Sequence, residues 1–155
     1  MPLGDNFPPA LKEQQINNSI SSGKVLKLFC PFTKPPKEKY LLLISINPTV
    51  CVFIINSEIN LFVQSKYDLQ EAQVLIKKND YNFLDHDSYI ACNEVIEYFS
   101  LEEIKKQLSQ DISRIKGKIT PSTRNHILIS TNNCRALSKI EKRKIVESMN
   151  SIVFD

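Results

Sequence analysis

The sequence predicts an α+β domain, in which a small antiparallel β-barrel is followed by two or three short C-terminal helices. Two observations predict this class. Short strand-like segments crowd the first two thirds of the chain with no long helix between them, and the hydrophobic period becomes helical after residue 100. The 155 residues suffice for one hydrophobic core but are few for two full domains. The expected parts are a flexible N-terminal tail over 1–22, a barrel body over 23–99 and a helical extension of the same domain over 100–155.

Residues 1–22 have the composition of a tail. They contain three prolines, a glycine and a run of Asn, Gln and Ser. Large apolar residues are too few to offset the entropy lost on ordering. Leu11 and Ile16 are the side chains that would dock part of this segment as a short helix on the body or on a partner.

Strand-like segments begin at Gly23. The first, 24–30, nearly alternates between polar and apolar residues, and the proline-rich loop after it interrupts strand pairing because proline lacks the backbone donor. The next two segments, joined by Asn47-Pro48-Thr49, predict a hairpin, and their continuous apolar character indicates burial on both faces. The expected strands after the first are 39–46, 50–55, 59–62, 72–76 and, as a closing strand, 89–92.

Helix signals follow residue 100. Residues 100–103 and 138–141 both match the capping box, in which a serine and a glutamate satisfy each other's free backbone donors. Thr120 and Pro121 offer an N-cap followed by proline at the first helical position. The first helix is expected to end at Gly117 in a left-handed conformation.

Charge and targeting signals exclude several classes of protein. The 20 basic and 17 acidic residues give a net charge of +3, so a polyanion site must be a local patch. The N-terminus lacks the pattern of a signal peptide, and the longest apolar run, 40–46, is far shorter than the roughly 20 residues that span a bilayer. We expect a cytoplasmic protein with no membrane partner.

The cysteines are spread along the chain without a C-x-x-C pair, which argues against a disulfide framework and against a zinc site. Each lies among apolar or β-forming neighbours, so we expect buried, reduced thiols. No metal and no other cofactor is expected. The four residues are Cys30, Cys51, Cys92 and Cys134.

Three short motifs follow one another between residues 23 and 45: Gly23-Lys24-Val25, Pro31-Phe32-Thr33, and Lys39-Tyr40-Leu41-Leu42-Leu43-Ile44-Ser45. They resemble the opening of the PemK/MazF toxin barrels, which typically read Gly-Asp-Ile/Val, a strand ending in Pro-Phe-Thr, a charged loop and Arg-Pro-x-x-Val-x-Ser. The resemblance lies mainly in residues 23–57. It implies an SH3-like barrel, usually dimeric, that cleaves single-stranded RNA without a metal.

The resemblance also implies catalytic positions. Lys39 stands where the family has an arginine, and Ser57 stands near the position of a threonine or serine. Lysine supplies the positive charge that a phosphate needs but lacks the planar fork of arginine. His86 lies between Asp85 and Asp87, which favour its charged form and suit a general acid.

Two other interpretations of the polar cluster at 85–89 stay open at this point. Asp and Ser before a strand commonly form local turns through bonds from side chain to backbone. His86 is also a conceivable base for a nucleophilic Cys92, although their nearness in sequence does not indicate an activated thiolate.

Five lysines near the loop 31–38 predict a surface for RNA, because ammonium groups neutralise phosphates and aromatic side chains stack on bases. The alternative is a solvated loop that protects a barrel edge from aggregation. The residues expected to bind nucleic acid, with Lys39, are Lys24, Lys27, Lys34, Lys37, Phe32 and Tyr40.

Two functions follow from these patterns. The first is a toxin-type, metal-independent endoribonuclease of the PemK/MazF kind acting on single-stranded RNA, or a degenerate relative of one. The second is a non-enzymatic adaptor that binds a protein partner in a phage-defence or toxin–antitoxin system, suggested by the replaced arginine and the additional helices. The expected partners are RNA, a cognate protein or antitoxin, and a second copy of the chain.

Overall fold

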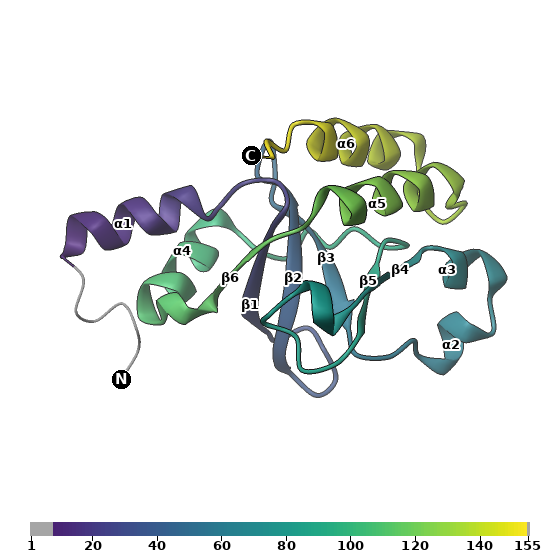
Figure 1. Ribbon diagram of the computed structural model, residues 1–155, viewed down its shortest axis with the longest axis horizontal. Helices are drawn as coiled ribbons and strands as arrows, with labels where there is room; N and C mark the ends of the chain where they lie inside the picture. Colours follow the sequence, from purple (N-terminus) through teal and green to yellow (C-terminus); the bar gives the residue numbers. More distant parts are fainter. Residues whose placement is uncertain (1–7, 155) are drawn as a thin grey trace.

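The structure, a computed structural model, describes residues 8–154 apart from the side chain of Leu61. One antiparallel sheet of six strands forms its centre, in the order β4-β5-β3-β2-β1-β6 (Figure 1). The strands are β1 Lys24–Cys30, β2 Lys37–Ser45, β3 Cys51–Asn56, β4 Gln73–Ile76, β5 Ser88–Ala91 and β6 Ile115–Lys118. The helices are α1 Pro9–Asn18, α2 Leu61–Gln64, α3 Tyr67–Glu71, α4 Leu101–Gln110, α5 Pro121–Asn133 and α6 Lys139–Asn150, with 3-10 turns η2 Lys78–Asp80 and η3 Ile112–Arg114.

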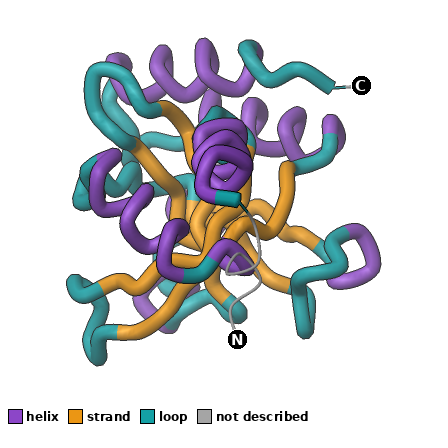
Figure 2. Tube along the Cα trace, turned by 90° about the vertical axis from the view of Figure 1, so that its left-hand side faces the viewer, coloured by secondary structure: helices purple, strands orange, loops and turns teal. Residues whose placement is uncertain are grey.

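The α+β class predicted from the sequence is confirmed. Strands occupy the predicted segments 24–30, 39–46, 50–55, 72–76 and 89–92, with small differences at their ends. The sheet curls into half a barrel (Figure 2). Its two edges are β4 and β6.

Alternating side chains of the sheet enter two separate cores, because successive residues of a strand point to opposite faces. The apolar continuity of β2 and β3 therefore reflects burial on both faces, as predicted. The α5/α6 face contains Leu42, Phe53 and Ile90 with Ile127 of α5 and Ile145 of α6. The opposite face, which we call the α1/α4 face, contains Leu26, Leu28, Leu41 and Val52 with Ile16, Ile104 and Leu108 of the helices. Each fully buried side chain of this size contributes about 1.5–3 kcal/mol through the hydrophobic effect.

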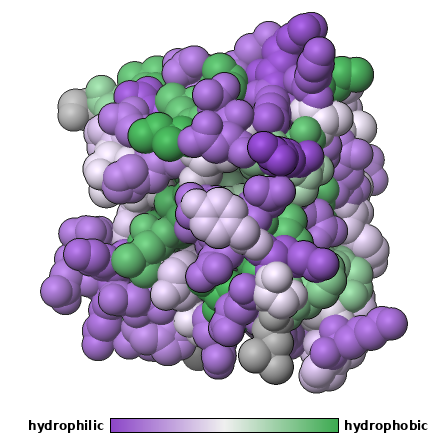
Figure 3. Space-filling view, turned by 90° about the vertical axis from the view of Figure 1, so that its right-hand side faces the viewer, coloured by the Kyte–Doolittle hydropathy of each residue, from purple (hydrophilic) through white to green (hydrophobic). Residues whose placement is uncertain are grey.

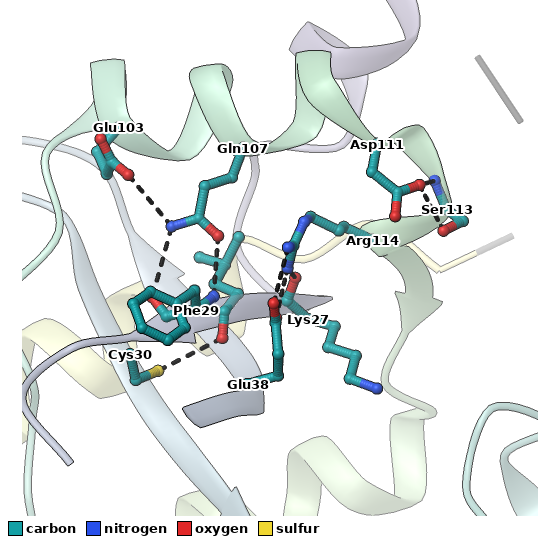
Figure 4. A network of polar contacts seen from close by, with 10 residues as sticks. Lys27, Phe29, Cys30, Glu38, Glu103, Gln107, Asp111, Ser113 and Arg114 are labelled. Carbon is teal, nitrogen blue, oxygen red and sulfur yellow. Dashed lines mark hydrogen bonds and ion pairs between the residues drawn. The ribbon is translucent and has the colours of Figure 1, made fainter. Parts of the chain in front are cut away.

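Polar side chains fasten α4 and η3 to the free edge of β1 (Figure 4). The amide of Gln107 accepts a hydrogen bond from Phe29 N at 2.8 Å and donates to Phe29 O at 3.4 Å. Arg114 donates to Lys27 O at 2.9 Å and forms a two-pronged ion pair with Glu38, at 2.5 and 2.8 Å. These side chains satisfy strand groups that β6 does not reach.

The helix α1 lies within the segment that composition predicted to be a flexible tail. Pro9 starts the helix, Ile16 is buried, and the helix packs against α4 (Figure 1). Ile20, just beyond the helix, is buried in the same core. Burial of these two isoleucines against the body offsets the entropy lost on ordering the segment, although residues 1–22 contain few large apolar side chains. Residues 1–7 of the expected tail lie outside the described residues.

Two further local predictions were wrong. Residues 59–62 do not extend the sheet, because Asn60 Oδ1 accepts a hydrogen bond from Val63 N and begins the short helix α2 there. The helix from Leu101 ends at Gln110, and Gly117 lies in β6 with φ +149°. This strand pairs with β1, so the sheet draws on the segment 100–155 as well as on the segment 23–99.

Gly23 allows the chain to enter β1 closely beside the C-terminus. Its φ is +89°, a conformation that side chains disfavour, and an added Cβ would lie 2.7 Å from Ile152 Cδ1. Gly23 N donates to Leu43 O at 2.9 Å, and Ile119 N donates to Gly23 O at 3.0 Å. A glycine is therefore required where three segments meet.

The helix caps agree in part with the sequence. Ser138 and Glu141 form the predicted capping box, and Thr120 caps α5. Ser100 caps α4 through Glu103 N, whereas the Glu103 side chain accepts a hydrogen bond from Gln107 instead of completing a box. No helix within residues 8–154 has both the length and the apolar character to cross a membrane.

Candidate functional site

Lys39 and Asn56 form the centre of the candidate site. Pairing of Tyr40 with Ile55 places Lys39 of β2 directly opposite Asn56 of β3, so both side chains lie on one face of the sheet. The Lys39 ammonium donates a hydrogen bond to Asn56 Oδ1. Both residues lie at the end of the α1/α4 face, beyond its apolar core.

A pocket of about 260 Å³ opens beside this pair. Loop residues before β2, the helix α2, and the ends of β3, β4 and β5 form its walls. The polar side chains that line it are Thr33, Lys39, Asn56, Asn60, Gln73, Asn93 and Glu94.

The hydrogen bonds of three asparagines orient their amide groups. Asn56 Oδ1 accepts from Lys39, Asn60 Oδ1 accepts from Val63 N at 2.8 Å, and Asn93 Oδ1 accepts from Gln73 Nε2 at 2.8 Å. Since each amide oxygen is used within the protein, each NH₂ group is left as a donor. The pocket thus combines three amide donors with one ammonium group, an arrangement suited to an anion.

Electrostatics at Lys39 favour the same ligand. Within residues 8–154 the one ion pair joins Arg114 and Glu38, so the Lys39 ammonium has no carboxylate within 4.0 Å. Burial lowers the pKa of Lys39 below its ordinary value, and the nearby charge of Lys37 lowers it further. A half-buried cation without a counter-ion gains from binding a phosphate.

Cys30 lies near Lys39 but is unsuited to nucleophilic chemistry. Burial raises the pKa of its thiol to about 11, although the charge of Lys39 acts in the opposite direction. Burial also raises the pKa of Cys92, chiefly by removing it from water, with a further contribution from Cys134. Cys92 is also fully buried, so its thiol is shielded from a substrate, and both observations count against its interpretation as a nucleophile. All four cysteines are buried and free, as predicted.

The predicted residue Ser57 follows Asn56 directly. It is exposed, and it does not line the pocket that contains Lys39. In this region, the residue whose side chain meets Lys39 is Asn56, one position earlier in the chain. Strand alternation explains the offset, because neighbouring residues of a strand point to opposite faces.

His86 lies on the loop before β5 and does not line the pocket of Lys39 either. Its Nδ1 lies 3.4 Å from Ser88 Oγ, and the neighbouring Asp87 accepts a hydrogen bond from Lys78 N at 2.8 Å. Ser88 Oγ also donates to His86 O at 3.1 Å, so the contacts of Ser88 with His86 are those of a local turn, the alternative that the sequence also allowed, whereas the bond to Asp87 joins the loop to η2.

The residues expected to bind nucleic acid are divided between the two faces. Lys27 lies 5.3 Å from the ring centre of Tyr40, and both belong to the face opposite Lys39. Lys24 lies at the far end of β1, beside α1. Lys34 and Lys37 are exposed in the region of the loop beside Lys39.

Phe32, in the same loop, is half-buried. Its ring packs against Tyr98 at 4.8 Å and Phe99 at 5.8 Å between ring centres. Of the predicted set, the structure therefore leaves Phe32 and Lys34 in the loop that leads to β2, and Lys37 at the start of β2, two residues before Lys39.

Sequence reasoning identified part of the pocket. The segment 56–60 follows a buried strand, and its Ser57, Glu58 and Asn60 suggest hydrogen bonds to a nucleotide or a peptide, with an ordinary turn as the alternative. Gln73 and Asn93 come from other segments and follow no motif, so they were missed. Within residues 8–154, no cluster of three or more His, Cys, Asp or Glu side chains is placed to hold a metal. No family model matches this chain, and no curated protein or solved structure matches it either.

Proposed function

We propose that this chain is an endoribonuclease of the PemK/MazF kind, or a degenerate relative, that binds single-stranded RNA at the Lys39 pocket. The observation that supports this best is the grouping of an unpaired ammonium with three amide donors. We also propose that the curled sheet is an SH3-like barrel, because the resemblance of residues 23–57 to this family implies one. The antiparallel order of β1, β2 and β3, with Lys39 at the start of the second strand, is compatible with that assignment.

The proposed reaction is attack of a ribose 2′-hydroxyl on the adjacent phosphorus, which breaks the bond to the 5′-oxygen of the next nucleotide. It needs a proton acceptor, a proton donor and positive charge for the phosphorane. Lys39 and the amides of Asn56 and Asn93 would hold the non-bridging oxygens. Glu94 is the carboxylate that lines the pocket, and we assign it as the proton acceptor.

Ser57 and His86 are the other proposed participants in proton transfer. Ser57 is next to Asn56 in the chain but lies outside the pocket, so its hydroxyl reaches the phosphate only if the end of β3 changes conformation. His86 reaches the site only if the loop before β5 moves. These two assignments are therefore tested separately from that of Lys39.

A neighbouring aromatic side chain supports a nucleic-acid ligand over a small anion. Phe62 lines the same pocket and is 65% exposed. Exposed rings beside a phosphate site stack on bases, with about 1–3 kcal/mol per base. We propose that one base adjoining the bound phosphate stacks on Phe62.

End-labelled single-stranded RNA tests the proposal in two assays, cleavage and fluorescence anisotropy. RNA with 2′-O-methyl groups lacks the nucleophile, so it is expected to bind without being cleaved. Lys39→Ala is expected to lower cleavage at least about 100-fold, and Lys105→Ala, at an exposed position on α4, serves as the matched control. Equal cleavage by both variants and the parent chain would exclude Lys39 from the reaction.

The remaining assignments need single variants in the same assays. Glu94→Gln is expected to reduce cleavage while RNA binding is retained, because it removes a base and a negative charge. Ser57→Ala and His86→Ala are also expected to reduce cleavage if these side chains transfer protons. Unchanged cleavage in any variant removes that residue from the mechanism.

A second candidate function is a non-enzymatic adaptor for a protein partner or antitoxin. Exposed apolar side chains on the C-terminal part of the chain favour it, among them Ile129, Ile140 and Val153. Copurification of a stoichiometric protein without RNA, together with no cleavage, supports the adaptor. Cleavage that is lost in Lys39→Ala supports the nuclease.

A further inference from the structure

The strand β4 is an edge of the sheet, and part of its backbone is unpaired. Cys92 N donates to Ala72 O at 3.0 Å, which fixes the phase of the ladder between β4 and β5. In that register the N–H and C=O groups of Val74 point toward β5, and those of Gln73 and Leu75 point outward. Among residues 8–154, no protein group hydrogen-bonds the outward groups of Gln73 and Leu75.

A groove of about 450 Å³ runs between this edge and α5. Its walls are β4 on one side and Ser122, His126 and Ile129 of α5 on the other. Leu75 is 42% exposed and Ile129 is 60% exposed, so apolar side chains lie within reach of a ligand in the groove. Figure 3 views the molecule from the side of α2 and α3, where hydrophobic side chains show between hydrophilic ones.

One end of the groove carries positive charge. Lys77 lines this end with Thr120, the N-cap of α5, where the helix dipole is positive. The helix contains no Asp or Glu, and Asp80 is the carboxylate among the lining residues. An acidic side chain of a ligand would be favoured beside Lys77 and the first turn of α5.

We propose that the groove between β4 and α5 binds an extended, acidic segment of a partner protein, which adds to the sheet as a strand beside β4. Unpaired backbone donors and acceptors at strand spacing recognise a polypeptide in extended form. Apolar side chains of the segment would pack on Leu75 and Ile129. Lys39 does not line the groove, and Gln73 is the residue that lines both the groove and the Lys39 pocket.

The test uses a fluorescent peptide of nine residues, alternating valine and threonine and ending in two glutamates. The peptide is expected to bind, and binding should shift the backbone amide signals of Gln73 and Leu75 in NMR spectra of the protein. The same peptide with alternate amides N-methylated is expected to bind at least about fivefold more weakly, because it cannot donate to the edge. Replacing its glutamates by lysines is expected to weaken binding as well.

Two variants of the full chain locate the contact. Leu75→Pro removes an N–H that β5 does not use, so the sheet tolerates it while peptide binding falls; Leu75→Thr retains the N–H and is the control. Lys39→Ala, which removes the proposed RNA site, is expected to leave peptide binding unchanged. The two proposals therefore fail independently.

Three results would overturn the groove proposal. One is equal binding of the methylated and unmethylated peptides. This comparison uses only the parent protein, so it does not depend on whether a variant folds. Another is no binding of either peptide at millimolar concentration. The third is concentration-dependent pairing of two copies through β4, seen by light scattering and lost in Leu75→Pro.

Discussion

The Lys39 ammonium hydrogen-bonds Asn56 Oδ1 across β2 and β3, although the two residues lie 17 positions apart in the chain. This contact holds the charge at the pocket while leaving the Asn56 amide NH₂ free. Replacing Asn56 by Asp keeps the geometry but gives Lys39 a counter-ion. RNA affinity is expected to fall about tenfold in Asn56→Asp, because the carboxylate competes with phosphate for the ammonium. Asn56→Ala, which adds no charge, is expected to lose less in the same anisotropy titration.

RNA binding is expected to weaken as the pH rises. The loss should begin at a lower pH than it would if the phosphate were held by a lysine with an ordinary pKa. Burial and Lys37 lower the pKa of Lys39, so its ammonium is lost earlier as pH rises. Anisotropy titrations between about pH 7 and pH 10 measure the effect. In Lys39→Arg the guanidinium stays charged over this range, so its curve is expected to be flatter. Parallel curves for the two proteins would argue against a phosphate contact at this position.

The Glu38–Arg114 ion pair predicts loss of stability in acid. The hydrogen bond from Arg114 lowers the pKa of Glu38, so its contribution is present above the ordinary glutamate pKa, about 4.3, and is lost as pH falls through the lowered folded value. Glu38→Gln is expected to cost about 0.5 kcal/mol at neutral pH. Urea unfolding measures it, with the exposed Glu102→Gln as control. The difference in free energy of unfolding between Glu38→Gln and the parent protein should vanish at low pH, where Glu38 is protonated.

Gly23→Ala is expected to destabilise the protein by about 1–3 kcal/mol. The substitution combines a positive φ with a Cβ placed against Ile152. Gly117→Ala separates these two effects, because Gly117 also has a positive φ but an added Cβ would meet no atom within 4 Å. Urea midpoints should rank the parent first, Gly117→Ala second and Gly23→Ala last. The reverse order of the two variants would contradict the contact with Ile152.

Thiol titration tests the burial of the cysteines. With Ellman's reagent at neutral pH, the native protein is expected to show no fast-reacting thiol, because all four are buried and burial raises the pKa of Cys30 to about 11. Four thiols should react after denaturation without reductant. A rapid native reaction of Cys92 would reopen its interpretation as a nucleophile.

The fold was predictable where local pattern and burial agree. The strand segments 24–30 and 50–55 and the capping box at Ser138 appear where the sequence places them. The sheet order was not predictable. The strand β6 follows α4 and pairs with β1, which lies far earlier in the chain, and hydrophobic periodicity does not indicate which distant strands pair. The helix α1 was only an alternative to a flexible tail for the same reason, since its stability depends on burial of Ile16 by distant residues, while Leu11 stays exposed.

The candidate site was predictable in part. Lys39 was identified from the motif that carries the family resemblance, and Asn60 from the polar segment after a buried strand. Asn93 contributes only through its orientation, which depends on a hydrogen bond from Gln73 that forms on folding. Amides that act through geometry leave no recognisable spacing in the sequence.

The pairing of β6 with β1 has a consequence for synthesis on the ribosome. A nascent chain that has emerged only as far as α4 exposes the outer edge of β1, because the strand that covers it is made later. Lys27 O and the groups near Val25 then lack the partners that Arg114 and Gly117 supply. We expect such intermediates to need protection from aggregation until β6 has left the exit tunnel.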